Sequence, residues 1–227
     1  MDPFHYITDD CLSSDSLWLL IRHGEKVQPP KENPFVDVPL TQKGIEEATR
    51  FGKLLKNKFP NEIKGVHSSP KRRCVETSEA ILKGIGDLEG FETSTLLGNP
   101  GPYVIDSKVA GQSYLKIRDE NIVKIQVEGT QIDGFRDVME GSKLLLEYVL
   151  TRKPNPGMHI FVTHDVIIAA FLGSVIGYVV DEPEWIKYLQ GICIYIDDKK
   201  VYMDTIEGKI DITKNAVTFL SLEGGNE

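Results

Sequence analysis

The chain has 227 residues, and its contents of 41% hydrophobic and 26% charged residues are ordinary for a soluble globular protein. Its 34 acidic residues outnumber its 26 basic residues, which gives a formal net charge of −8. Because nucleic acids and anionic membrane surfaces attract clustered Lys and Arg, this balance argues against a general nucleic-acid binder or a polybasic membrane-surface protein. Any anion-binding site must be a local basic pocket in an acidic surface.

The cysteines and the N-terminal residues favour a cytoplasmic location. Cys11, Cys74 and Cys193 match the spacing of neither a zinc ribbon nor a disulfide framework, which favours a reducing compartment. Residues 1–16 lack the basic and apolar regions of a signal peptide, and no apolar run approaches the ~20 residues that span a bilayer. We therefore expect no membrane partner, and a polar arm at the N-terminus.

The first half of the chain reads as a strand-helix-strand-helix unit. The apolar run Leu17–Ile21 predicts a strand that is buried on both faces of a parallel sheet. A proline-rich loop follows, and Thr41 is the candidate N-cap of an amphipathic helix over 41–58. Residues 63–67 predict a second strand, parallel to the first, and residues 71–84 predict a second helix.

The pattern loosens over residues 84–130, where glycines and prolines interrupt it and only a helix near 112–125 is predicted. Compact domains usually connect their elements within ~15 residues, so we interpret 84–130 as a lid or substrate-facing insertion in a single domain that spans 1–227. The remaining predicted elements are a helix over 133–151, a strand over 158–163 and a helix over 166–177. Strands within 192–196, 200–206 and 216–222 are expected to close the sheet, some of them antiparallel.

Polar residues follow three predicted strands at the point where each strand ends. The segments are Arg22-His23-Gly24-Glu25, Ser69 to Arg73, and His164-Asp165. The carboxyl ends of neighbouring parallel strands meet at one edge of a sheet. Guanidinium groups match phosphate oxygens, helix N-termini add oriented amides, and a neutral imidazole can attack phosphorus to form a covalent phosphohistidine. This edge is therefore predicted to be a site for phosphoryl chemistry.

Four spaced signatures in this order resemble the histidine phosphatase superfamily, which includes the phosphoglycerate-mutase-like phosphatases and the acid phosphatases. They are Arg22-His23-Gly24-Glu25, Leu40-Thr41-x-x-Gly44, Ser69-Pro70-x-x-Arg73-x-x-x-Thr77, and a strand that runs into His164. The resemblance implies an α/β fold, a three-layer α/β/α sandwich, here expected with a mostly parallel central sheet and a helical or irregular insertion. It also implies that His23 is the phosphorylated nucleophile and that Arg22, Arg73 and His164 hold the phosphoryl oxygens.

Departures from the family patterns bear on the activity. Mutase-like members usually have Ser or Thr after Arg-His-Gly-Glu and a Glu-Arg-His-Tyr type of segment in the insertion, whereas this chain has Lys26 and no such segment. Mutase activity is therefore disfavoured. Acid-phosphatase-like members carry an arginine where Lys26 stands, and a His-Asp pair in which the aspartic acid protonates the leaving group, where His164-Asp165 stands.

The identity of the general acid stays open at this point. Asp165 is the first candidate, although it could instead cap the helix that follows it. Glu25 is the leading substitute, followed by a carboxylate of the insertion such as Asp106. Lys26, Glu25, Tyr103 and Trp185 are the predicted substrate contacts, although aromatic residues in irregular segments are as often part of the core.

The sequence predicts a metal-independent phosphomonoesterase that forms a phosphohistidine on His23 and acts on a small phosphorylated substrate or a phosphopeptide. No metal ligand set is expected and no cofactor, because metalloprotease, acidic-loop, Cys/His and glycine-rich nucleotide motifs are absent from the sequence. The alternative is a non-catalytic module on the same fold that binds a phospho-ligand or phosphoprotein. A same-class alternative is a phosphoglycerate-mutase-like phosphotransferase. The sequence determines neither the substrate nor the oligomeric state.

Overall fold

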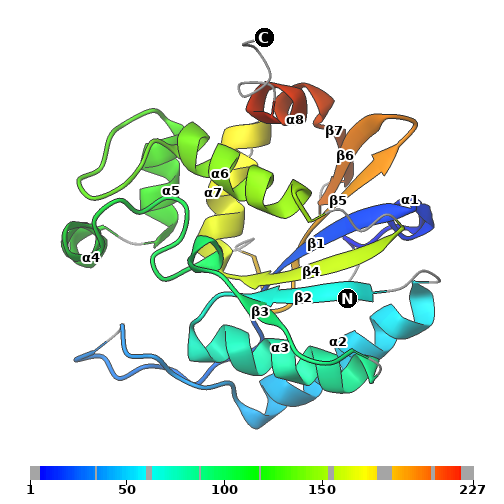
Figure 1. The fold of residues 1–227 in the computed structure, drawn as a ribbon. Helices are drawn as coiled ribbons and strands as arrows, with labels where there is room; N and C mark the ends of the chain where they lie inside the picture. The colour runs from blue at the N-terminus through cyan, green and yellow to red at the C-terminus, as the bar shows by residue number, and fades with distance from the viewer. Residues whose placement is uncertain are drawn as a thin grey trace.

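The computed structural model describes residues 6–33, 35–59, 63–86, 88–117, 119–152, 156–177, 186–205 and 208–220. Within these residues one seven-stranded sheet, in the order β3-β2-β4-β1-β5-β6-β7, forms the centre of the fold (Figure 1). The strands are β1 (Ser16–Arg22), β2 (Ile63–Ser68), β3 (Glu92–Thr93), β4 (Gly157–Thr163), β5 (Gly191–Asp197), β6 (Lys200–Thr205) and β7 (Gly208–Asp211).

The sheet is mixed. Strands β3, β2, β4 and β1 are mutually parallel, whereas β5, β6 and β7 continue the sheet from β1 as antiparallel neighbours. The expectation of a mostly parallel sheet is therefore wrong. The reason is that β5, β6 and β7 follow one another through short connections, which can join only antiparallel strands, while a parallel pair needs a long crossover. Strands β1 and β2 are parallel as expected, with β4 between them.

Helices cover both faces of the sheet, which confirms the predicted α/β/α sandwich (Figure 1). Helices α2 and α3 pack together on one face, and α6 and α7 lie on the other, with α5 against α7 and α8 against α6. The helices are α1 (Asp9–Ser13), α2 (Gln42–Lys58), α3 (Arg72–Ile85), the 3-10 helix η1 (Thr95–Leu97), α4 (Ser107–Lys116), α5 (Asp119–Val127), α6 (Val138–Leu150), α7 (Asp165–Ile176) and α8 (Thr213–Leu220).

The apolar run of β1 supplies both halves of the core. Leu17, Leu19 and Ile21 pack into the cluster beneath α2 and α3, while Trp18 and Leu20 pack into the cluster beneath α6 and α7. All five side chains are buried, and full burial of a large apolar side chain contributes roughly 1.5–3 kcal/mol. A strand held this firmly on both faces gives the residues at its carboxyl end a fixed position.

Several helix boundaries differ from the predictions. Thr41 is the N-cap of α2 as expected, because its side chain accepts a hydrogen bond from Gly44 N. The helix predicted at 112–125 is two helices, since Ile117 adopts an extended conformation that ends α4. The helix predicted from 133 begins only at Val138, where Asp137 accepts hydrogen bonds from two amides of the first turn.

The C-terminal prediction is wrong in its last element. Residues 216–220 belong to helix α8 rather than to a strand, and residues 221–222 lie outside the described residues. A short apolar run has no periodicity that distinguishes a strand from one or two turns of helix. In α8 the buried Ala216 lies beside Val217, whose side chain is 58% exposed. Strand β7 was not predicted.

The described part of the predicted N-terminal arm, from residue 6 onward, packs against the sheet. Tyr6 is fully buried, and its hydroxyl donates to Leu189 O at 2.8 Å. Cys11 on α1 forms a disulfide with Cys193 on β5, and Cys74 is a buried free thiol. The expectation of unpaired cysteines is therefore wrong, and the argument for a reducing compartment loses this support. None of the helices in the described part of the chain is long and apolar enough to cross a membrane.

The disulfide generates a prediction about stability. It links residues 182 positions apart, and removing a cross-link over a long loop usually costs about 2–4 kcal/mol of folding free energy. For a chain of this size Cys11→Ser should lower Tm by about 5–15 °C, measured by circular dichroism. Reductant should lower Tm of the wild type and leave the variant unchanged; equal shifts in both proteins would contradict a stabilising disulfide.

Candidate active site

Three strand ends meet at one edge of the sheet. Arg22, the last residue of β1, pairs with Thr163, the last residue of β4. Ser68, the last residue of β2, pairs with Val162 on the other side of β4. The structure thereby brings together, in one cluster, five residues that the sequence singled out: Arg22, His23, Arg73, His164 and Asp165.

His23 is buried at the centre of this cluster, with 2% of its surface exposed. Its Nδ1 lies 2.8 Å from Gly24 O, a contact that is a hydrogen bond only if Nδ1 carries the proton. Nε2 then holds the free lone pair, and it accepts a hydrogen bond from Arg73 Nε at 3.1 Å. The atom best placed to act as a nucleophile is therefore Nε2.

The backbone after His23 is held by two helices. Gly24 N donates to Thr77 Oγ1 of α3 at 2.9 Å. At the start of α2, a Cβ on Gly44 would stand 2.3 Å from Glu25 O, so this helix can approach the loop only because residue 44 is glycine. These contacts explain why Gly44 and Thr77 occur in the spaced signatures.

Arg73 connects the two histidines. Its Nη2 donates to His164 Nδ1 at 3.2 Å while its Nε donates to His23 Nε2. His164 is 7% exposed, and its Nε2 lies 3.0 Å from Ser69 Oγ, which fits donation from Nε2 because Nδ1 is already an acceptor. Two imidazoles and one guanidinium group thus share a single hydrogen-bonded arrangement.

Arg22 lies beside this arrangement, paired with Asp165. Its Nη2 is 2.7 Å from Asp165 Oδ2, and both side chains are 15% exposed. Its Nη1 donates to Ile186 O at 2.5 Å, and its guanidinium carbon lies 4.4 Å from the centre of the Tyr188 ring. Asp165 Oδ1 also accepts a hydrogen bond from Val166 N at 3.0 Å. In this structure Asp165 therefore both pairs with Arg22 and contacts the first turn of α7.

The other candidate acids have different surroundings. Glu25 accepts a hydrogen bond from Thr41 Oγ1 at 3.0 Å and pairs with Lys43 at 2.9 Å, and the bond to Lys43 is the main cause of the lowered pKa of Glu25. A carboxyl group with a lowered pKa stays ionised, so this environment opposes proton donation. Asp106 is the N-cap of α4, where it accepts from two backbone amides.

The described residues among the predicted substrate contacts have different surroundings. The backbone of Lys26 bridges to Leu40, and its side chain is half-buried. Tyr103 is buried in the core beneath α6, where its hydroxyl lies 2.9 Å from Ser142 Oγ and burial raises its pKa. Trp185 lies outside the described residues.

Two residues at the cluster were not assigned from the sequence. Asp37, in the loop between β1 and α2, accepts from Arg72 N at 3.1 Å through both carboxylate oxygens and lies 3.7 Å from Arg73 Nη1. No local pattern marks it. The Tyr188 ring lies 5.9 Å from that of His23. The signal for Tyr188 is its place in an irregular segment, where an aromatic residue is as often part of the core as of a pocket. No group of three or more potential metal ligands occurs among the residues that the structure describes.

Burial and nearby arginine keep both histidines neutral. Burial, followed by the charge of Arg73, lowers the pKa of His23 to about 3. The same two causes hold the pKa of His164 well below its usual value of 6.5. A neutral imidazole keeps the lone pair that nucleophilic attack requires. The lowered pKa of His23 therefore agrees with its hydrogen bonds, which identify Nε2 as the atom best placed to act as a nucleophile.

These lowered pKa values predict how stability depends on pH. Below pH 6.5 His23 becomes protonated in the unfolded chain, whereas buried His23 in the folded protein stays neutral down to about pH 3. Folding stability therefore falls as the pH is lowered from 6.5 to about 3. His23→Gln should reduce the slope of the unfolding free energy by up to about 1.4 kcal/mol per pH unit. Urea denaturation at pH 6, 5 and 4 measures the slope. Identical slopes for wild type and variant would mean that His23 is not neutral when folded.

Comparison with known sequences identifies one family. The model of the histidine phosphatase superfamily (branch 1) matches residues 18–98, which include three of the four signatures. A 2,3-bisphosphoglycerate-dependent phosphoglycerate mutase from Streptomyces griseus subsp. griseus is 39% identical over 69 residues, which cover 29% of this chain and 26% of that protein. The match thus spans only about a quarter of that relative.

Solved structures extend the likeness to most of the chain. A phosphoglycerate mutase from Bacillus anthracis superposes with a TM-score of 0.57 at 16% identity, over 92% of this chain and 98% of the other. A mycobacterial glucosyl-3-phosphoglycerate phosphatase gives 0.51 at 12% identity, over 87% and 97%. At such identities the likeness shows the fold alone. Together, the family model over residues 18–98 and this shared fold confirm that the chain resembles the histidine phosphatase superfamily.

Proposed function

We propose that the chain is a phosphatase, specifically a metal-independent phosphomonoesterase that forms a phosphohistidine intermediate on His23. The observation that carries this proposal is the arrangement in which Arg73 contacts the neutral rings of both His23 and His164. A nucleophilic nitrogen and several guanidinium donors converge on one small region of a protein whose net charge is −8. Phosphoryl transfer needs mainly such positioning and charge stabilisation.

Substrate binding has to rearrange one contact. Arg73 Nε donates to His23 Nε2, which is the atom that must attack phosphorus. The oxygens of a bound phosphoryl group compete for the donors of Arg73 and Arg22 and thereby free the lone pair of Nε2. Nδ1 keeps its hydrogen bond to Gly24 O, which orients the ring and stabilises the positive charge that develops on it.

The reaction then has two steps. His23 Nε2 forms a bond to phosphorus while the bond from phosphorus to the ester oxygen breaks, and the departing oxygen receives a proton. A water molecule next attacks phosphorus and gives a proton to the carboxylate of the general acid, the nitrogen–phosphorus bond breaks, and inorganic phosphate leaves. Arg22, Arg73 and His164 hold the phosphoryl oxygens in both steps. Neither step requires a metal ion.

Asp165 is the proposed general acid. Its contact with Arg22 supports this role, because Arg22 is one of the residues proposed to hold the phosphoryl oxygens. The phosphate competes for the Arg22 guanidinium, and a neighbouring dianion favours the protonated form of a carboxylic acid. Substrate binding itself therefore prepares Asp165 to donate a proton.

The proposed substrates are a small phosphorylated molecule or a phosphopeptide, with residues 84–130 as a lid or substrate-facing insertion. A mutase would transfer the phosphoryl group to a second hydroxyl rather than to water, and Lys26 departs from the mutase pattern. A non-catalytic binder on the same fold remains the alternative of a different class, since fold does not determine activity. The cytoplasmic location stays a prediction.

The first test of the function replaces the nucleophile. His23→Ala should lower hydrolysis of an aryl phosphate, assayed with a chelator present, by roughly 1,000-fold or more. Rapid acid-free quenching of the wild type should trap acid-labile phosphate on the protein, and none on the variant. His159→Ala, four residues before Thr163 on β4, is the matched control and should retain activity. Undiminished hydrolysis by His23→Ala would exclude the mechanism, and binding without turnover would indicate the non-catalytic alternative.

The second test concerns the acid. Asp165→Asn should lower kcat by roughly 100- to 10,000-fold for alkyl phosphates, whose leaving groups need a proton, and far less for aryl phosphates with acidic phenols. Rates are compared across leaving groups of increasing acidity. An equal loss for every leaving group would assign Asp165 a structural role at α7 instead.

A further inference from the structure

Exposed apolar side chains are concentrated on two segments beside the site. Eight large hydrophobic residues are exposed among those described, and five of them lie in the β1–α2 loop or in the insertion. Scattered exposed apolar residues are normal, whereas a concentration next to a site indicates a binding surface. The five are Val27, Phe35 and Val36 in the loop, and Ile105 and Leu115 in the insertion, with exposed fractions from 37% to 68%.

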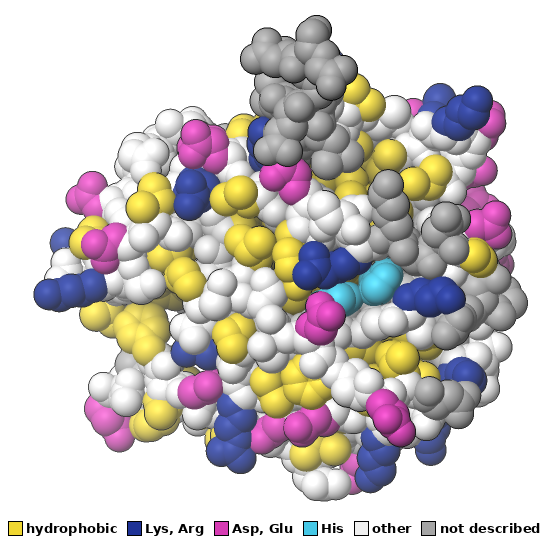
Figure 2. All heavy atoms as spheres, viewed as in Figure 1, with side chains coloured by type: hydrophobic (Ala, Val, Ile, Leu, Met, Phe, Trp, Pro, Cys, Tyr) yellow, Lys and Arg dark blue, Asp and Glu magenta, His cyan; other side chains and the backbone are white. Residues whose placement is uncertain are grey.

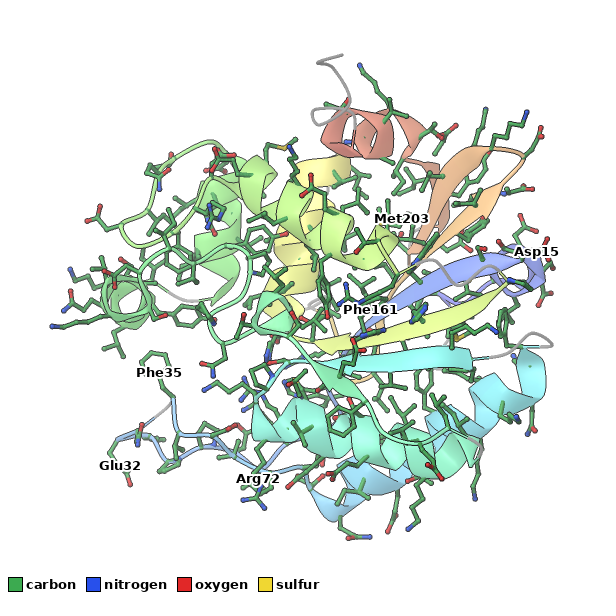
Figure 3. All side chains as sticks on the ribbon, viewed as in Figure 1. Asp15, Glu32, Phe35, Arg72, Phe161 and Met203 are labelled. Carbon is green, nitrogen blue, oxygen red and sulfur yellow. A yellow bond between two sulfur atoms is a disulfide. The ribbon has the colours of Figure 1, made fainter. Side chains whose placement is uncertain are left out.

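The two segments flank the carboxyl ends of the parallel strands. In Figure 1 the β1–α2 loop extends past this edge of the sheet on one side, and α4 lies beyond it on the other. The rings of Phe35 in the loop and Tyr114 in α4 meet edge to face, with centres 5.9 Å apart. In Figure 3 Phe35 points toward α4, whereas Glu32 points away from it. Figure 2 shows hydrophobic side chains at the surface between the loop and α4.

Both segments are connected to the phosphoryl cluster. Asp37, two residues after Phe35, contacts Arg73 and the first amide of α3. On the other side, a Cβ on Gly98 would stand 2.4 Å from the His164 ring, so the start of the insertion packs directly on that histidine. Each of the two segments therefore has one contact with the phosphoryl cluster, through Asp37 and through Gly98.

Carboxylates already face two positive groups at the phosphoryl cluster and beside it. Asp37 faces Arg73 Nη1 at 3.7 Å and the N-terminus of α3, and Glu25 faces Lys43. A second anionic group on the substrate would meet these carboxylates and would have to displace them. The surroundings therefore favour an uncharged group next to the phosphate.

We propose that the substrate is a phosphate monoester of an uncharged, apolar alcohol, aryl or alkyl, whose hydrocarbon part lies against Phe35, Val36 and Leu115. This inference rests on the proposed phosphatase function and names its substrate class. Burial of each additional methylene should raise kcat/KM by about 3- to 4-fold until the apolar surface is covered.

A homologous series of n-alkyl phosphates from ethyl to octyl tests the proposal, with 3-phosphoglycerate and a phosphoserine peptide as anionic or polar comparisons. We expect kcat/KM to rise along the series and to be at least about 10-fold lower for the two comparisons than for octyl phosphate. A flat or falling series, or a preference for either comparison, would overturn the proposal.

Two variants locate the apolar surface. Phe35→Ser and Leu115→Ser should each lower the ratio of kcat/KM for octyl phosphate to that for ethyl phosphate by about 5- to 10-fold. Ile196→Ser is the control, because Ile196 is 42% exposed on β5 but lies at the opposite end of the sheet. An unchanged ratio in both site variants would overturn the proposal.

Binding of n-alkyl phosphonates, measured by calorimetry, separates the two inferences because it requires no turnover. Affinity that rises with chain length, without hydrolysis of any ester, would overturn the phosphatase function while supporting the apolar surface. Hydrolysis of all esters at equal kcat/KM, with affinity independent of chain length, would leave the phosphatase function intact and overturn the substrate class.

Discussion

The position of β4 between β1 and β2 is the constraint on which the site depends. Because these three strands are parallel neighbours, their carboxyl ends lie at one edge, and residues more than 90 positions apart come within hydrogen-bond distance. The dual burial of β1 makes that edge rigid, since the strand cannot shift without exposing part of the core on one face or the other. Rigid strands carrying short polar ends are a common way to hold reacting groups precisely.

The electrostatics of the cluster follow from burial. The imidazoles of His23 and His164 are shielded from solvent and stay neutral. The guanidinium groups of Arg22 and Arg73 are positively charged, and such charges, when partly buried, require nearby negative groups. In the described structure Asp165 and Asp37 supply part of that compensation. In the proposed mechanism a phosphate that enters the cluster competes with these carboxylates, so phosphate binding and the proton donation proposed for Asp165 are linked.

Arg22 is also held by two segments to which the sequence patterns assigned no role. Leu189 N donates to Arg22 O, and Leu189 O accepts from Tyr6 of the N-terminal segment. The disulfide from Cys11 fastens that segment to β5. Residues of the predicted polar arm thus support the segment that contacts Arg22, the arginine proposed to hold phosphate.

The sequence predicted those features that depend on residues close together in the chain. The buried strand β1, the Thr41 cap, the residues at three strand ends and the family resemblance could all be read from spacing, because periodicity and capping act over one or two turns. Five of the predicted site residues, Arg22, His23, Arg73, His164 and Asp165, lie together as their places at strand ends indicated.

Only the tertiary structure decided the features that depend on distant partners. These are the order of the strands in the sheet, the break at Ile117, the Cys11–Cys193 bond, the pairing of Asp165 with Arg22, and the place of Asp37 beside Arg73. Each results from which surfaces pack together over long sequence separations. A sequence pattern indicates whether a residue prefers a helix, a strand or a buried position. It does not indicate which residue, distant in the sequence, will pack against it.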